Sequence, residues 1–260
     1  MTGVYIELLD AKKLAYLLVD GYWQVSVVEE IDSTQTALTK KNSVHGEVLV
    51  TEFQSAGRGR LDRTFEANKS KSLLFSFFVK PTRPREDWGW IPLLAGISLE
   101  RVFNRELKVF STKWPNDLLA INSAHDGKVA GILVEAKENG VVVGMGINVS
   151  MGTDELPVAT ASSLMLAGVT QLDRNIYLAS ILKEFATLLK QWESTKNTET
   201  SEEIRLIYEK NSSTIGKRVE VHGLDGAVES GLAIGIGAQG ELVLDNGSHI
   251  YSGDVVHLFT

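Results

Sequence analysis

Cysteine is missing from all 260 residues of the chain. Its absence excludes disulfide bonds and thiolate catalysis, and it fits a reducing compartment such as the cytoplasm. The sequence also lacks an apolar run long enough to cross a bilayer, and its N-terminus lacks the basic-then-apolar pattern of a secretory signal. We therefore expect a cytoplasmic protein with no membrane partner.

The chain has fewer basic than acidic residues, with 26 Lys and Arg against 33 Asp and Glu, so the net charge is −7. Such an acidic chain is a poor candidate for sequence-independent nucleic-acid binding, which needs cations to neutralise phosphates. Only about two dozen residues precede the first expected strand, too few for a winged helix-turn-helix. The five histidines have no closely spaced partners. We expect neither DNA binding nor a zinc site.

Apolar periodicity predicts alternating helices and strands up to about residue 212. The expected helices cover 10–19, 88–107, 161–167, 173–193 and 201–208, and another begins after the N-cap residues near Ser33. The expected strands cover 23–29, 47–54, 72–79, 112–121, 128–136 and 141–149, with a hairpin turn at Asn139-Gly140. This order indicates an α/β (α+β) domain with a mixed, largely antiparallel sheet and flanking helices.

The remaining residues are rich in short strands and turns. The expected strands are 218–222, 226–236, 241–244, 249–251 and 255–259, separated by Gly, Asp and Asn. This pattern is typical of a small β-barrel. We therefore divide the chain into a domain of residues 1–212 and a C-terminal β domain of residues 213–260.

The six residues from Gly235 to Gly240 match the Gly-x-Gly-x-x-Gly pattern of dinucleotide-binding proteins. That pattern binds pyrophosphate only where a helix begins at it, because helix N–H groups make the contact. Here the apolar run 241–244 follows at once and predicts a strand. We interpret the six residues as a turn and expect no dinucleotide cofactor.

A glycine-spaced loop follows the expected strand 47–54. Gly57 and Gly59 allow the backbone to approach a ligand closely. The loop also carries planar, permanently charged groups suited to phosphate or carboxylate, namely Arg58, Arg60 and Arg63. Taken alone, this stretch fits an anion-binding loop and a solvated or RNA-binding segment equally well.

Three later motifs favour the anion-binding interpretation. They are Lys113-Trp114-Pro115-Asn116-Asp117, Gly127-Lys128-Val129-Ala130-Gly131-Ile132-Leu133 and Gly146-Ile147-Asn148. Together with the arginine loop, and in this order, they resemble the catalytic domain of biotin protein ligases, also called biotin–[acetyl-CoA-carboxylase] ligases. The resemblance runs from about Trp23 to the C-terminus, where that family places an SH3-like domain. Two positions depart from the common pattern: Asp62 replaces Gly, and Phe65 replaces Trp.

The resemblance implies a two-step reaction that uses ATP, carried with Mg²⁺, and biotin as substrates. Biotin carboxylate attacks the α-phosphorus of ATP, which gives biotinyl-5′-AMP and pyrophosphate. A lysine of a biotin carboxyl carrier protein domain then accepts the biotin. The first step brings an anion onto a polyanion, and like charges about 4 Å apart repel by roughly 4 kcal/mol at an effective dielectric near 20. Cations must offset this repulsion.

The family motifs imply roles for residues of this chain. Lys128 matches the lysine that bridges biotin carboxylate and α-phosphate, and Arg58 and Lys113 are the other expected catalytic cations. The residues expected at biotin are Ser33, Thr34, Gln35, Gln54, Arg58, Gly59, Arg60 and Lys128. Those expected at ATP or the adenylate are Arg58, Arg60, Arg63, Lys113, Asn116, Asp117 and Asn148, with Asp117 as the candidate Mg²⁺ ligand. Trp114 fits packing against the ligand and packing in the core equally well.

Two other functions are compatible with the sequence. A lipoyl or octanoyl transferase has a related fold, although the arginine loop and Lys113–Asp117 favour biotin. A biotin-sensing module without turnover is the second alternative, and the retained Lys128 argues against it. A monomer and a weak dimer fit the chain equally well.

Overall fold

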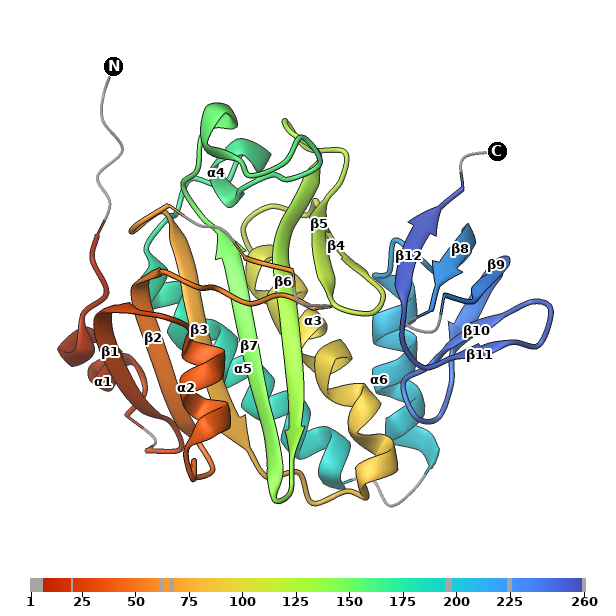
Figure 1. The fold of residues 1–260 in the computed structure, drawn as a ribbon, viewed down its shortest axis with the longest axis horizontal. Coiled ribbons are helices and arrows are strands. Elements are labelled where there is room, and N and C mark those ends of the chain that lie inside the picture. The colour runs from red at the N-terminus through yellow and green to blue at the C-terminus, as the bar shows by residue number, and fades with distance from the viewer. Residues whose placement is uncertain are drawn as a thin grey trace.

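A seven-stranded sheet organises the larger part of the chain (Figure 1). The computed structural model describes residues 7–19, 21–60, 63–65, 68–194, 198–223 and 226–258. The strands of this sheet are β1 (Gln24–Ile31), β2 (Glu47–Gln54), β3 (Ser72–Val79), β4 (Phe110–Lys113), β5 (Asp117–Ala120), β6 (Gly127–Lys137) and β7 (Gly140–Asn148). Their order is β1-β2-β3-β7-β6-β5-β4. Only β1 and β2 pair in parallel among these neighbours, which confirms the mixed, largely antiparallel sheet.

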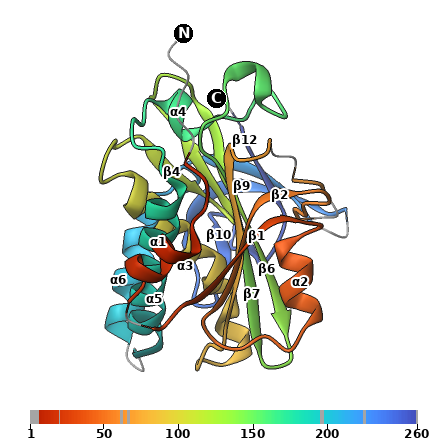
Figure 2. The ribbon, with the colours of Figure 1, turned by 90° about the vertical axis from the view of Figure 1, so that its left-hand side faces the viewer.

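Helices cover both faces of the sheet (Figure 2). The helix α2 (Thr34–Lys40) lies on one face. On the opposite face lie α1 (Ala11–Leu17), α3 (Trp90–Phe103), α5 (Arg174–Ser194) and α6 (Thr198–Lys210). Shorter helical segments are η1 (Arg85–Gly89), η2 (Thr153–Glu155) and α4 (Leu164–Ala167). None of the helices in the described residues is both long and apolar enough to cross a membrane.

The strand β3 is buried at every position, because helices cover it from both sides. Its side chains alternate between the two faces, as in any strand. Phe77 packs edge-on against Phe185 of α5, with ring centroids 4.7 Å apart. Phe78 packs with Leu38 of α2. Burying a side chain of this size contributes about 1.5–3 kcal/mol to stability. Ser76 lies on the α2 face, where the site is built.

The segment expected as one strand, 112–121, is instead the hairpin of β4 and β5. Lys113 pairs with Asp117 across it, and residues 114–116 form the turn. Pro115 explains the difference, because proline has no N–H to donate to a continuing ladder. Asn116 lies in this turn and Asp117 begins β5, and both residues line the cavity described below.

Several other boundaries differ from the sequence prediction; the helix expected over 161–167, for example, is α4 and begins only at Leu164. The helix expected over 88–107 divides into η1 and α3 and ends at Phe103, where Asn104 Nδ2 and Oδ1 bond the backbone of Phe110 and hold the turn into β4. Gly140 is the first residue of β7 and pairs with Lys137. The hairpin turn is therefore Glu138-Asn139, one residue earlier than expected.

A second, antiparallel sheet follows α6, as the sequence predicted. Its strands are β8 (Arg218–His222), β9 (Val228–Ile236), β10 (Leu242–Leu244), β11 (His249–Ile250) and β12 (Asp254–His257). Their order is β11-β10-β9-β8-β12. The Gly-x-Gly-x-x-Gly stretch ends β9 and forms the turn into β10. No helix begins there, which confirms the interpretation of this stretch as a turn. The last expected strand reached residue 259, which lies outside the described residues.

Two buried tryptophans join the second sheet to the larger domain, Trp90 from the start of α3 and Trp114 from the turn between β4 and β5. The Trp90 indole Nε1 donates to the carbonyl of Ala238 at 2.8 Å. The Trp114 Nε1 donates to the carbonyl of Gly240 at 3.1 Å. Both carbonyls belong to the turn between β9 and β10. Trp114 is only 2% exposed and therefore packs in the core, which decides between the two roles that the sequence allowed.

Candidate active site

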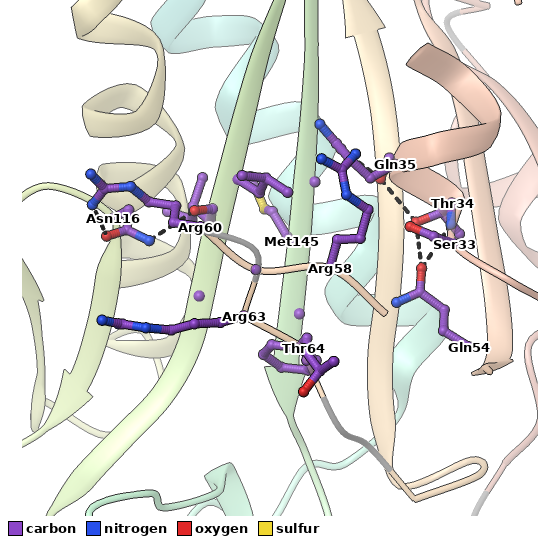
Figure 3. A pocket seen from close by; sticks show the side chains of 18 of the residues that line it. Ser33, Thr34, Gln35, Gln54, Arg58, Arg60, Arg63, Thr64, Asn116 and Met145 are labelled. Atoms are coloured by element: carbon purple, nitrogen blue, oxygen red, sulfur yellow. Dashed lines mark hydrogen bonds between the residues drawn. The ribbon is translucent and has the colours of Figure 1, made fainter. Parts of the chain in front are cut away.

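A cavity of about 150 Å³ lies over the centre of the large sheet, beneath the arginine loop (Figure 3). One water needs roughly 10–15 Å³ measured in this way, so the space is large enough for a small organic ligand. Most residues that the sequence singled out line it, namely Ser33, Thr34, Gln35, Gln54, Arg58, Gly59, Arg60, Arg63, Asn116, Asp117 and Lys128. Segments distant in sequence thus meet at one place.

One end of the cavity carries short, neutral polar groups from the first turn of α2. The backbone N–H and the hydroxyl of Thr34 both donate to Gln54 Oε1, at 2.7 and 3.0 Å. The Ser76 hydroxyl lies 2.9 Å from that of Thr34 and donates to Gln35 Oε1 at 3.1 Å. Ser33 caps the helix by accepting from the Thr36 N–H. This end suits a compact neutral ring that both donates and accepts hydrogen bonds.

The other part of the cavity is cationic. Arg58 binds Glu135 through two nitrogens, at 3.0 and 3.2 Å. Lys128 Nζ lies 2.6 Å from Asp117 Oδ1. Arg63 forms an ion pair with a residue of β12, Asp254. Each of these three cations therefore holds one carboxylate.

Arg60 differs from the other cations of the cavity. Its Nη1 donates to Asn116 Oδ1 at 3.0 Å and to the Gly253 carbonyl at 3.3 Å, which are both neutral acceptors. Within the described ranges, Arg60 is the one cation of the cavity lining with no carboxylate within 4 Å. Burial lowers the pKa of Arg60, while Asp254 and Asp117 oppose that shift. Arginine still remains charged, so Arg60 is the cation most available to an incoming anion.

The aromatic ring of Phe65 lies against the sheet between the neutral end and the cationic end of the cavity. Gly131 and Gly146 face each other across β6 and β7. A Cβ atom on Gly146 would lie only 2.5–2.8 Å from atoms of the Phe65 ring. Only glycine leaves room for the ring to lie against the strand there. Asp62, the other position that departs from the family pattern, lies outside the described residues.

Comparison with known proteins agrees with this geometry. Residues 27–152 match the Biotin/lipoate A/B protein ligase family, and residues 214–258 match the Biotin protein ligase C terminal domain. The chain is 34% identical to the biotin–[acetyl-CoA-carboxylase] ligase of Mycobacterium tuberculosis, over 96% of both chains. This chain belongs to the biotin protein ligase family.

A solved structure and a second curated relative support the same assignment. The biotin protein ligase of Aquifex aeolicus, in complex with biotin and ATP, matches with a TM-score of 0.75 and 27% identity, over 91% of this chain and 99% of that one. The bifunctional ligase/repressor BirA of Bacillus subtilis is 29% identical over 88% of this chain and 71% of its own length. The SH3-like character expected of the second sheet agrees with the C-terminal family model.

Two residues that the ligase motifs assign to the site lie outside the cavity lining, Lys113 and Asn148. Asn148 is buried, and its Nδ2 donates to the Ser162 carbonyl at 3.0 Å. The Ser162 N–H donates in turn to the carbonyl of Lys128 at 2.8 Å. Asn148 therefore supports the backbone that carries Lys128. The charge of Lys113 acts elsewhere: burial is the largest cause that lowers the pKa of His257, followed by the charges of Lys113 and Lys217.

The lining of this ligase site is compatible with an ion carried by the nucleotide. Among the described residues there is no cluster of three His, Cys, Asp or Glu side chains that could hold a metal ion. Mg²⁺ typically takes one or two protein carboxylates and completes its coordination with phosphates and water. Asp117, which lines the cavity, can serve as one such carboxylate.

Sequence reasoning missed several residues of the lining, among them Ser76, Met145 and Asp254. Ser76 had a usable signal, because it is a polar residue inside the apolar run Leu73–Val79. A buried hydroxyl needs a partner, and here the partners are Thr34 and Gln35. Asp254 had no local signal, since its partner Arg63 lies 191 residues earlier.

Proposed function

We propose that this protein is an ATP-dependent biotin protein ligase that forms biotinyl-5′-AMP and transfers biotin to a lysine of a biotin carboxyl carrier protein domain. The observation that carries the proposal is one cavity with a neutral, hydrogen-bonding end and a cationic end that includes Lys128 and Arg60. Biotin has the matching chemistry, with a neutral ureido ring at one end and a carboxylate at the other. The M. tuberculosis relative bears the name of such a ligase.

In this assignment the neutral end holds the ureido ring. Thr34, Gln54 and Ser76 already share hydrogen bonds, so the ring meets groups that are fixed in place. A buried polar group left without a partner costs about 1–3 kcal/mol. The ring must therefore match these donors and acceptors, and a purely apolar ligand of the same size is rejected.

At the cationic end, the carboxylate of biotin and the α-phosphate of ATP meet beside Lys128. The ammonium group offsets the repulsion between these two anions. Asp117 holds Lys128 until then, at 2.6 Å. Arg60 has no carboxylate partner, so it can bind phosphate oxygens without first breaking an ion pair. Mg²⁺, carried with ATP, would supply further positive charge, and Asp117 and Asn116 of the cavity lining would hold it.

The deciding experiment measures pyrophosphate release from purified protein mixed with ATP and either biotin or lipoate. We expect release with biotin and none with lipoate. Release with lipoate alone would favour the lipoyl alternative. Tight biotin binding with no pyrophosphate from ATP would favour a sensor without turnover.

Two further assignments concern the domain boundary and the cellular location. We propose that the domain boundary falls at residues 212/213, because α6 ends at Lys210 and β8 begins at Arg218. We also propose a cytoplasmic location, in line with the absence of cysteine.

We predict that the protein does not bind DNA specifically. The net charge of −7 opposes the phosphate neutralisation that DNA binding requires. A gel-shift assay with duplex DNA at physiological salt, with the B. subtilis ligase/repressor and its operator as positive control, tests this. Sequence-specific retention that persists against excess competitor DNA would contradict the prediction.

A further inference from the structure

Two arginines of the loop bind one dipeptide of the C-terminal sheet. Arg63 forms an ion pair with Asp254, and Arg60 donates to the carbonyl of Gly253 at 3.3 Å. Asp254 also lines the cavity. The second sheet therefore supplies a carboxylate at the edge of the cationic end of the cavity, where we place the nucleotide. No ligase motif of the sequence pointed to this carboxylate.

The position of this dipeptide is fixed by the strand beside it. Asp254 is the first residue of β12 and pairs with His222 of β8. Gly253 has a φ of +154°, a conformation that residues with a side chain rarely adopt. A Cβ atom there would lie 2.7 Å from Val221 Cγ1 and 3.0 Å from the His222 carbonyl. The backbone is thus packed tightly against β8, and the Asp254 carboxylate starts from a fixed point.

A carboxylate at this edge needs an explanation, because the nucleotide that enters is a polyanion and like charges repel. The ion pair is also exposed, with 65% of the Arg63 side chain and 30% of the Asp254 side chain accessible. Ion pairs this exposed contribute little to folding stability. Stabilisation of the fold is therefore a weak reason for placing Asp254 there.

We propose that Asp254 is a positioning residue for the arginine loop. Asp254 binds Arg63 while the cavity holds no nucleotide, and Arg63 leaves Asp254 for the phosphates when ATP binds. The proposal rests on the proposed ligase function for the identity of the nucleotide. Arg63 then has an anionic partner both before and after ATP binds. Asp254 competes with ATP for Arg63, so this carboxylate sets the affinity for nucleotide and leaves that for biotin unaffected.

The test compares the unmodified protein with Asp254→Asn, which removes the charge and keeps the shape. We expect the KM for ATP to fall about two- to fivefold, the range that breaking one exposed ion pair supplies, and the KM for biotin to stay unchanged. Trypsin, applied without ligands, should cut after Arg63 faster than in the unmodified protein. The control is Glu229→Gln, which removes an exposed charge from the same sheet outside the cavity lining.

A second comparison separates competition from simple repulsion. In an Arg63→Ala background, Asp254→Asn should leave the KM for ATP unchanged, because the arginine for which Asp254 and ATP compete is absent. A fall in KM that persists there would assign the effect to charge repulsion and overturn the proposal. An unchanged or raised KM in the single variant, or unchanged cleavage after Arg63, would also overturn it. If the unmodified protein releases no pyrophosphate, the proposed function fails, and the digestion alone then decides the role of Asp254.

Discussion

Replacing Lys128 with alanine should slow the formation of biotinyl-5′-AMP by about 100- to 1,000-fold while the protein stays folded. The repulsion that Lys128 offsets is roughly 4 kcal/mol at 4 Å and an effective dielectric near 20, and each 1.4 kcal/mol corresponds to a tenfold change in rate. Solvent reaches 41% of the Lys128 side chain and screens part of this effect, which sets the lower bound. The variant also leaves Asp117 as an uncompensated negative charge beside the phosphates.

The fold should survive this change because the side chain of Lys128 pairs only with Asp117 among the described residues. Its backbone bonds to Thr160 and Ser162 remain available to alanine. Pyrophosphate release in a single turnover measures the effect, and a thermal melt checks the fold. Lys69→Ala is the matched control, since Lys69 is an exposed lysine with one carboxylate partner outside the cavity lining. A folded Lys128 variant with near-normal release would remove Lys128 from the chemistry.

Replacing Arg60 with glycine should allow the adenylate to form but release it faster, by roughly 10- to 100-fold. Arg60 joins the loop to the β4–β5 hairpin through Asn116 and to the second sheet through Gly253. A hydrogen bond with a charged donor is worth about 1.5–3 kcal/mol, so losing these contacts opens the cover over the cavity. A mixed anhydride persists only where water and stray amines are kept out.

Escaped adenylate would then label lysines of unrelated proteins. The measurement mixes the Arg60→Gly variant with biotin, ATP and a bystander protein, and then probes the bystander for biotin. Arg60→Lys keeps the positive charge but replaces the planar guanidinium with a compact ammonium, and it should label the bystander less than Arg60→Gly. Slow pyrophosphate release together with an unlabelled bystander would instead assign Arg60 to the chemical step alone.

The sequence predicted the parts of this site that consist of short, contiguous motifs. Gly57–Arg63 and Gly127–Leu133 are short stretches whose residue types suit anions wherever the fold places them. The neutral end was also within reach, because a capped helix start such as Ser33-Thr34 exposes its own polar groups. These residues do meet in one cavity.

Other parts depend on contacts that no local pattern encodes. The turn at Pro115 divides an expected strand, and this turn brings Asn116 to within 3.0 Å of Arg60. The partner of Arg63 lies 191 residues away, so its identity depends on how the second sheet packs on the first. Lys113 belongs to the same motif as Asn116 but does not line the cavity. Motif membership alone does not determine on which side of a hairpin a side chain emerges.

The attachment of the loop to Gly253 and Asp254 also has a consequence for the order in which the enzyme becomes active during translation. All seven strands of the large sheet are synthesised by Asn148, and chains begin to fold from the N-terminal side as they emerge from the ribosome. Lys128 and Arg60 are present at that stage, but the carbonyl of Gly253 and the carboxylate of Asp254 are not. Until residues 253 and 254 are made, Arg60 and Arg63 therefore lack these two partners, and the second sheet does not yet hold the loop.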